Sequence, residues 1–231
     1  MFGTSYTGSV NTYRSASEIN SAMARVYNYM MLAILNSAVV SYLVSSSPGL
    51  MAVLFGTVLK WVILFSPLIA IFVISYFMDK VSKTGAQLML HGFAALMGLS
   101  LSTIFVIYTS SSIFMAFVSS AILFGVMSVY GYFTKKDLSS VGQFMIVGLI
   151  AIIIASIVNI FVGSSVLTTV ISALAIIIFL GLTAYDTQRI REMVSFNREE
   201  DNAEVSGALS LYMNFINIFI NLLQLFGDKK D

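Results

Sequence analysis

Seven apolar stretches constrain the fold of this chain more than any other feature of its sequence. A helix that crosses the hydrocarbon core of a bilayer needs about 20 consecutive, mostly apolar residues. Seven segments meet this requirement with short connections between them, at 26–44, 61–78, 86–108, 113–133, 141–162, 167–185 and 208–226. Backbone groups in lipid must be hydrogen-bonded within the protein, as they are in helices. The sequence therefore predicts an all-α polytopic membrane protein with seven transmembrane helices.

The composition agrees with this fold class and narrows the possible ligands. Hydrophobic residues make up 58% of the chain and charged residues 10%, with a mean hydropathy of +0.92. A soluble domain has about 25% charged residues. The formal net charge of +1 gives no basic surplus for nucleic acid, and a chain with one histidine and no cysteine lacks the usual ligands of a metal site. We expect the lipid bilayer as partner, with no nucleic acid, metal or cofactor.

Polar ends and basic connections predict the domains and the orientation. Residues 1–25 are rich in Ser and Thr and lack the apolar centre of a signal peptide. We therefore expect a flexible cytoplasmic tail at 1–25, the seven-helix domain at 26–226 and a short C-terminal tail at 227–231. Cytoplasmic connections of membrane proteins carry the excess of Lys and Arg. Nine of the twelve basic residues fall in the tail and the second, fourth and sixth connections, which places the N-terminus in the cytoplasm and the C-terminus outside.

One carboxylate interrupts the sixth apolar stretch. The run IIIFLGLTAYDTQRIR, residues 176–191, is wholly apolar until it reaches Asp186 and becomes basic within three residues. A charge near the membrane core is costly and often marks an ion or proton path. Asp186 is either an ordinary acid at a helix end, paired with Arg189 one turn on, or a titratable gate. Burial raises the pKa of a carboxylate and nearby positive charge lowers it, so a balanced group can respond to cytoplasmic pH.

The seventh stretch carries a stripe of polar side chains. Spacings of four, three, four and three residues place five of them on one helix face: Ser210, Asn214, Asn217, Asn221 and Gln224. One amide in a membrane helix commonly joins two helices. Five on one stripe exceed that need and predict the lining of a hydrated cavity or pore, and Asn159 of the fifth stretch is a further pore-lining candidate.

Two further features concern the gate and the packing. Asp79 and Lys80 end the second stretch at the level expected for Asp186, where they are either solvated or part of the gate. Small residues at helical spacing predict close helix contacts. They are Ala94, Gly98 and Ser102 in the third stretch, Gly125 and Gly131 in the fourth and Gly181 in the sixth.

The sequence gives no sign of an enzyme. It contains no G-x-S-x-G elbow, no HExxH and no P-loop. An intramembrane aspartyl protease needs two carboxylates that share a proton, and the seventh stretch has no acid between Val205 and Gly227. We therefore expect a protein without catalytic residues.

Three motifs resemble the Bax inhibitor (transmembrane Bax inhibitor motif) family, and its bacterial inner-membrane members most closely. They are TKKDLS at 134–139, GLTAYDTQRI at 181–190 and ALSLYMNFINIFINLL at 208–223. The resemblance extends over about residues 24–227 and implies a central helix surrounded by six others. It also implies a pH-sensitive calcium leak in the inner membrane, and for eukaryotic members a role in suppressing cell death.

The resemblance also implies a gate. Family members have a pair of aspartates on the sixth and seventh helices, of which Asp186 matches the first. Asn214 stands at the second, because this chain reads LYMNFIN where the family usually has LYLDFIN. The family's latch arginine falls near Asp79 and Lys80, and Lys80 is the residue that can replace it. Since an amide cannot ionise, we predict a single titration and a weaker pH response than the aspartate pair gives.

Two functions follow as hypotheses. The first is a pH-sensitive calcium leak or flux regulator, with calcium as a weakly bound transported ion and the gate at Asp186 and Asn214. The alternative is a non-conducting membrane regulator that binds another membrane protein, such as a quality-control protease.

Overall fold

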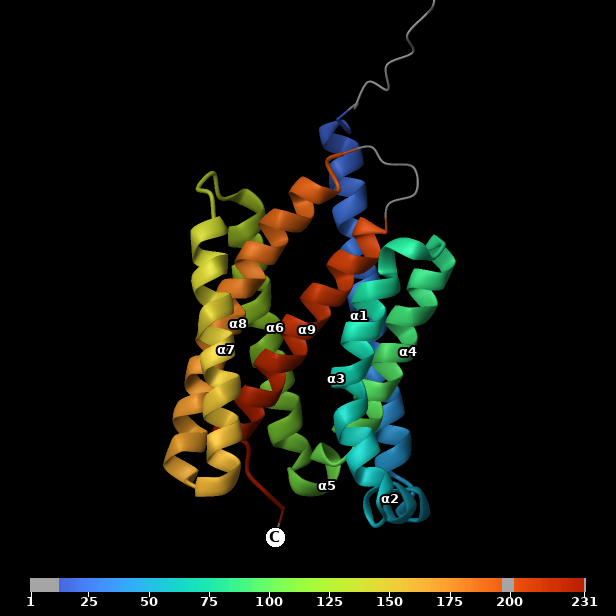
Figure 1. Cartoon of the computed structure of the whole chain (residues 1–231), viewed down its shortest axis with the longest axis vertical. Helices are drawn as coiled ribbons and strands as arrows, with labels where there is room; N and C mark the ends of the chain where they lie inside the picture. The colour runs from blue at the N-terminus through green and yellow to red at the C-terminus, as the bar shows by residue number, and fades with distance from the viewer. Residues whose placement is uncertain (1–12, 197–201, 231) are drawn as a thin grey trace, which may run out of the picture.

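The computed structural model describes residues 13–196 and 202–230 as a bundle of long helices (Figure 1). Seven helical segments are long and apolar enough to cross a membrane, as the sequence predicts. They are α1 (Ala16–Ser45), α3 (Leu59–Phe77), α4 (Lys83–Leu101) with its continuation α5 (Ile104–Ile107), α6 (Ser110–Phe133), α7 (Ser139–Val162), α8 (Ser165–Met193) and α9 (Ala203–Phe226). Two short elements join them, the helix α2 (Pro48–Phe55) and the 3₁₀ turn η1 (Met78–Lys80).

Helix α9 is the central helix of the bundle. Of the residues in its most apolar stretch 56% are buried, whereas none of those in the corresponding stretch of α7 is buried. The principal neighbours of α9 are α1, α4, α6 and α8, while α3 packs mainly on α4 and α7 on α8. The prediction of a central helix is thus confirmed, with four helices around it in direct contact and two at the edges.

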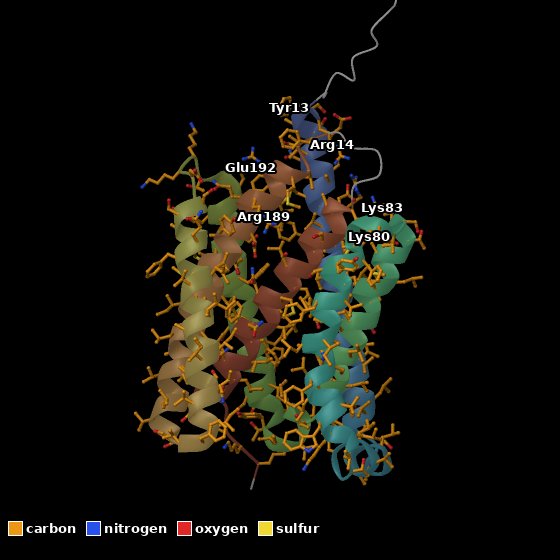
Figure 2. All side chains as sticks on the ribbon, in the orientation of Figure 1. Tyr13, Arg14, Lys80, Lys83, Arg189 and Glu192 are labelled. Carbon is orange, nitrogen blue, oxygen red and sulfur yellow. The ribbon has the colours of Figure 1, made fainter. Side chains whose placement is uncertain are left out.

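The two ends of the bundle differ in charge. α1 and α9 begin at one end, which we call the N-terminal face, and the chain ends at the opposite, C-terminal face (Figure 1). Arg14, Lys80, Lys83 and Arg189 all lie near the N-terminal face (Figure 2). At the C-terminal face the last residues pair with the α5–α6 connection, through the Lys230 amide to the Ile107 carbonyl.

The tail boundary and two helix ends differ from the sequence prediction. Helix α1 begins at Ala16 rather than at residue 26, because Ser15 and Glu18 form a capping box and Ala22 and Met23 are already buried. The helix therefore extends past the apolar stretch, while residues 1–12 lie outside the described part of the chain. Helix α8 likewise continues to Met193, which places Asp186 about two turns inside the helix.

The helix α3 carries Pro67 in its interior, where this residue removes one hydrogen bond of the helix. Proline cannot donate a hydrogen bond to the carbonyl four residues earlier, here that of Ile63. The hydroxyls of Ser66 and Ser100 donate to this carbonyl instead, over 3.0 Å and 2.7 Å. Since only Ile63 and Ile74 of α3 are buried, this helix is held mainly by α4 and by its ends.

Small residues bring two helix pairs together as predicted. A Cβ on Gly98 of α4 would lie 2.7 Å from the Ser37 carbonyl oxygen of α1, and one on Gly131 of α6 would lie 2.2 Å from the Ala184 oxygen of α8. At Gly181 the side chain of Met145 fills the space. Gly125 is the exception, with no neighbour within 4 Å of its Cβ position.

Candidate functional site

A cleft of about 690 Å³ lies beside the central helix, toward the N-terminal face. Helices α3 and α7 border it, and α8 and α9 supply all of its polar residues except Ser75 of α3. Its polar lining consists of Ser75, Asp186, Arg189, Ser206, Ser210, Asn214 and Asn217. Its apolar lining includes Leu68 and Ile71 of α3 and Leu149 and Ile153 of α7. The cleft thus combines one carboxylate with several amides and hydroxyls against an apolar wall.

Asp186 and Asn214 form the pair at the centre of this cleft. The Nδ2 of Asn214 donates to Oδ2 of Asp186 over 2.7 Å. Asn214 is 4% exposed and Asp186 is half-buried. The structure therefore brings together the two residues predicted for the gate. An amide in this place donates a hydrogen bond to the ionised carboxylate but adds no second titrating group.

Arg189 lies one turn beyond Asp186 and also lines the cleft, but its side chain is exposed (Figure 2). Within the described part of the chain, every salt bridge involves Glu204. Arg189 therefore makes no ion pair with Asp186. Asp186 is a half-buried carboxylate held by an amide rather than by an ion pair.

Only the first part of the polar stripe on α9 reaches the cleft. Ser210, Asn214 and Asn217 line it. The Nδ2 of Asn221 donates to the carbonyl of Asn217 in its own helix, and Gln224 accepts a hydrogen bond from Ser172 of α8.

The remaining pore-lining candidate lies at the opposite end of the bundle. Asn159 contacts the α7–α8 turn, where its amide donates to the Ser164 carbonyl and the Thr168 hydroxyl. Its own oxygen accepts from the Ser164 amide. The structure therefore does not bring Asn159, Asn221 or Gln224 to the cleft at Asp186.

The residues predicted at the end of α3 have a different surrounding. The ammonium group of Lys80 lies 3.4 Å from the ring centroid of Tyr76 and 5.7 Å from that of Phe77, so it stacks on its own helix end. Lys80 is not among the residues that line the cleft. The side chain of Asp79 lies outside the described part of the structure.

Sequence reasoning missed a second carboxylate near the same face, Glu204 in the first turn of α9. Its side chain is 6% exposed, and Arg25 and Lys83 bind it. Its neighbour Asn202, 3% exposed, donates to the carbonyls of Met78 and Val81 over 2.7 and 2.9 Å. An acid directly before an apolar run is typical of the first turn of a helix. This signal was overlooked because the seventh helix was expected to begin at residue 208.

The cleft offers few ligands for a bound ion. Calcium takes 6–8 oxygen ligands. Among the described residues, no three His, Cys, Asp or Glu side chains gather in one place. One carboxylate with the neighbouring amide and hydroxyl oxygens suits a weak and transient contact with a cation.

The fold and the cleft define a class of protein, an integral membrane protein with a polar cleft beside its central helix. The family comparison is more specific. The family model described as inhibitor of apoptosis-promoting Bax1 matches residues 19–231. This chain therefore belongs to the Bax inhibitor family.

Relatives in distant bacteria cover nearly the whole chain. The inner membrane protein YbhL of Escherichia coli is 37% identical over 214 residues, which are 90% of this chain and 92% of YbhL. A protein of Deinococcus radiodurans is 36% identical over 94% of both chains. An uncharacterized membrane protein of Streptococcus pyogenes is 36% identical over 90% of this chain and 93% of its own.

Proposed function

We propose that this protein is a pH-sensitive calcium leak or flux regulator of the bacterial inner membrane, with its gate at Asp186. The observation that carries the proposal is the cleft itself, in which a half-buried carboxylate, paired with an amide rather than with a basic side chain, lies in the membrane-spanning part of the chain. An acid so placed is costly unless it has a use. The E. coli relative's name places that protein in the inner membrane, which supports the same location here.

The orientation follows from the charges. The N-terminal face carries most of the basic residues and is therefore proposed to face the cytoplasm. The cleft then lies toward the cytoplasmic side, where Asp186 meets protons from the cytoplasm. Protonation of Asp186 removes the only formal negative charge among the cleft's lining residues and weakens its attraction for a cation.

A weak cation-binding site suits the passage of an ion better than its stable retention. Conduction requires that an ion bind well enough to enter and weakly enough to leave. The single carboxylate and its amide partner meet this condition, and the exposed Arg189 lowers the local attraction for cations further.

The alternative function is a non-conducting regulator that binds another membrane protein, such as a quality-control protease. The observation that favours it is the second half of the stripe on α9. The cleft's polar lining stops at Asn217, whereas Asn221 and Gln224 lie outside it and bond to Asn217 and Ser172. A continuous path to the opposite face then requires a conformation in which these amides exchange partners.

Calcium uptake into liposomes that contain only this protein distinguishes the two functions. The leak predicts uptake above that of empty liposomes, and a dependence on pH that Asp186→Asn removes. Asn159→Ala serves as the control, because this amide lies far from the cleft. Folded protein that passes no calcium at any pH would refute the leak, and recovery of a stoichiometric protein partner would then support the regulator.

A further inference from the structure

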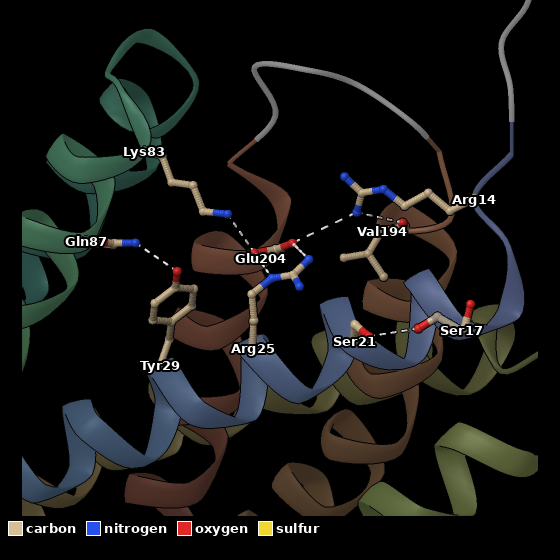
Figure 3. Close-up of polar contacts among 9 residues, drawn as sticks. All are labelled: Arg14, Ser17, Ser21, Arg25, Tyr29, Lys83, Gln87, Val194 and Glu204. Carbon is tan, nitrogen blue, oxygen red and sulfur yellow. Dashed lines mark hydrogen bonds and ion pairs between the residues drawn. The ribbon is translucent and has the colours of Figure 1, made fainter.

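A cluster of charged side chains lies outside the cleft, at the N-terminal face, and nothing described so far uses it (Figure 3). Its centre is the buried carboxylate of Glu204. Three cations from separate parts of the chain surround it: Arg14 before α1, Arg25 within α1 and Lys83 in the first turn of α4. We call Glu204 and these three residues the clamp.

The contacts of the clamp are short and directional. Arg25 binds with two nitrogens, Nε to Oε2 at 3.0 Å and Nη2 to Oε1 at 2.6 Å. The Nζ of Lys83 donates to Oε2 over 2.8 Å. Such two-pronged, charge-assisted bonds fix orientation as well as position. The start of α9 is thereby attached to both α1 and α4.

Arg14 extends the clamp to the other helix of the site. Its Nη1 lies 3.9 Å from Oε1 of Glu204 and donates over 3.1 Å to the carbonyl of Val194, the residue that ends α8. Its backbone amide donates to the Ser195 carbonyl over 2.9 Å, and the rings of Tyr13 and Phe196 pack at 5.2 Å. One side chain therefore contacts the end of α8 and the beginning of α9.

The two helices whose ends meet at the clamp, α8 and α9, both line the cleft. α8 carries Asp186 and α9 carries Asn214, and the two helices form the largest helix contact in the bundle. Between the clamp and the cleft they touch where Ile190 lies against Gly207, whose added Cβ would approach Ile190 to 2.8 Å. A change in the separation of the helix ends therefore passes through rigid helices to the Asp186–Asn214 pair.

We infer that Arg14 and Glu204 are positioning residues for the cleft: they hold α8 and α9 together at the N-terminal face and so keep the cleft narrow. This inference concerns regulation of the site in the proposed function and rests on that proposal for its biological meaning. The effect of Arg14 and Glu204 on the width of the cleft does not depend on whether the protein conducts calcium. Displacing the segment that carries Arg14 would release the end of α8 while Arg25 and Lys83 still hold α9.

The absence of cysteine from the chain gives a direct test. Ser210→Cys places a single thiol in the cleft, and its rate of reaction with a water-soluble thiol reagent reports the opening of the cleft. In this background Arg14→Ala should raise the rate roughly fivefold or more, the range of a modest coupling energy between sites. Arg14→Lys, which keeps a cation beside Glu204, should restore most of the original rate.

The control is Lys136→Ala, which removes a cation of the α6–α7 connection that has no contact with Glu204. Glu204→Gln should raise the rate further, and circular dichroism shows whether each variant remains helical. Equal rates in Arg14→Ala, Lys136→Ala and the parent would overturn the inference, as would equal acceleration by Arg14→Ala and Arg14→Lys. The assay uses no ion flux, so its result is independent of whether the protein conducts calcium.

Discussion

Two carboxylates near the same face of the bundle have opposite surroundings. Glu204 is 6% exposed and has three cations within 4 Å, whereas Asp186 has the amide of Asn214 as its hydrogen-bond partner. A buried acid surrounded by cations is a fixed charge that holds segments together. An acid held by an amide can gain or lose a proton without leaving a cation unpaired. The difference separates a structural carboxylate from one that can serve as a gate.

The largest expected effect comes from exchanging each acid for its amide. Glu204→Gln removes the shared partner of three cations and should lower the free energy of unfolding by roughly 1–3 kcal/mol, reduced from the fully buried case because Arg25 and Lys83 are about half exposed. Asp186→Asn should change it by less than about 1 kcal/mol. Thermal unfolding in detergent, followed by circular dichroism, measures both. Equal losses would contradict the distinction.

Asn202 offers the next test, because it binds the connection between α3 and α4 next to the clamp. Asn202→Ala leaves the carbonyls of Met78 and Val81 without their donor and should cost roughly 1–3 kcal/mol. The matched control is Asn20→Ala in α1, which removes the acceptor of the Tyr132 hydroxyl and no contact with η1. Hydrogen exchange should show faster opening of the η1 turn in Asn202→Ala only. Unchanged exchange at η1 would show that these two bonds do not hold the connection between α3 and α4.

Asn214→Asp tests the comparison of the two carboxylates at Asp186, the proposed gate. A second carboxylate 2.7 Å from Asp186 cannot ionise independently, so the pair should titrate in two steps and give a stronger pH response. The dependence of calcium flux on pH measures this effect, with Asn159→Asp as a control that adds an acid outside the cleft. A flux–pH curve identical to that of the parent would argue against a gate at this pair.

The smallest effects are expected in the second half of the stripe on α9. Asn221→Ala removes a hydrogen bond within its own helix and should change stability by about 0.5 kcal/mol or less. Its effect on calcium flux should be smaller than that of Ser210→Ala, since Ser210 lines the cleft. A larger flux loss in Asn221→Ala would extend the pathway toward the C-terminal face.

Some of this architecture can be predicted from sequence because lipid imposes strict rules. The seven apolar stretches indicate seven helices, and the polar spacing on α9 correctly indicates a helix with one polar side. The family resemblance aligns Asp186 and Asn214 with the aspartate pair, and in the structure a hydrogen bond joins the two residues. Their role as a gate stays a prediction.

The rest depends on contacts between distant segments. The helical pattern gives the same face to Ser210 and Gln224 but cannot show that Ser172 binds Gln224 while Ser210 lines the cleft. The clamp joins residues 14, 25, 83 and 204, whose polar character alone is equally typical of solvated helix ends. The additional turns of α1 and α8 were missed because apolar stretches mark the membrane-spanning part of a helix rather than its full length.

The most direct test of the account is calcium flux into liposomes stepped across the physiological range, from about pH 8 to about pH 5. The parent, Asp186→Asn and Glu204→Gln are measured side by side. The account predicts that Asp186→Asn loses the dependence on pH and that Glu204→Gln changes the size of the flux but keeps that dependence. Loss of the dependence in Glu204→Gln, with its retention in Asp186→Asn, would contradict the account.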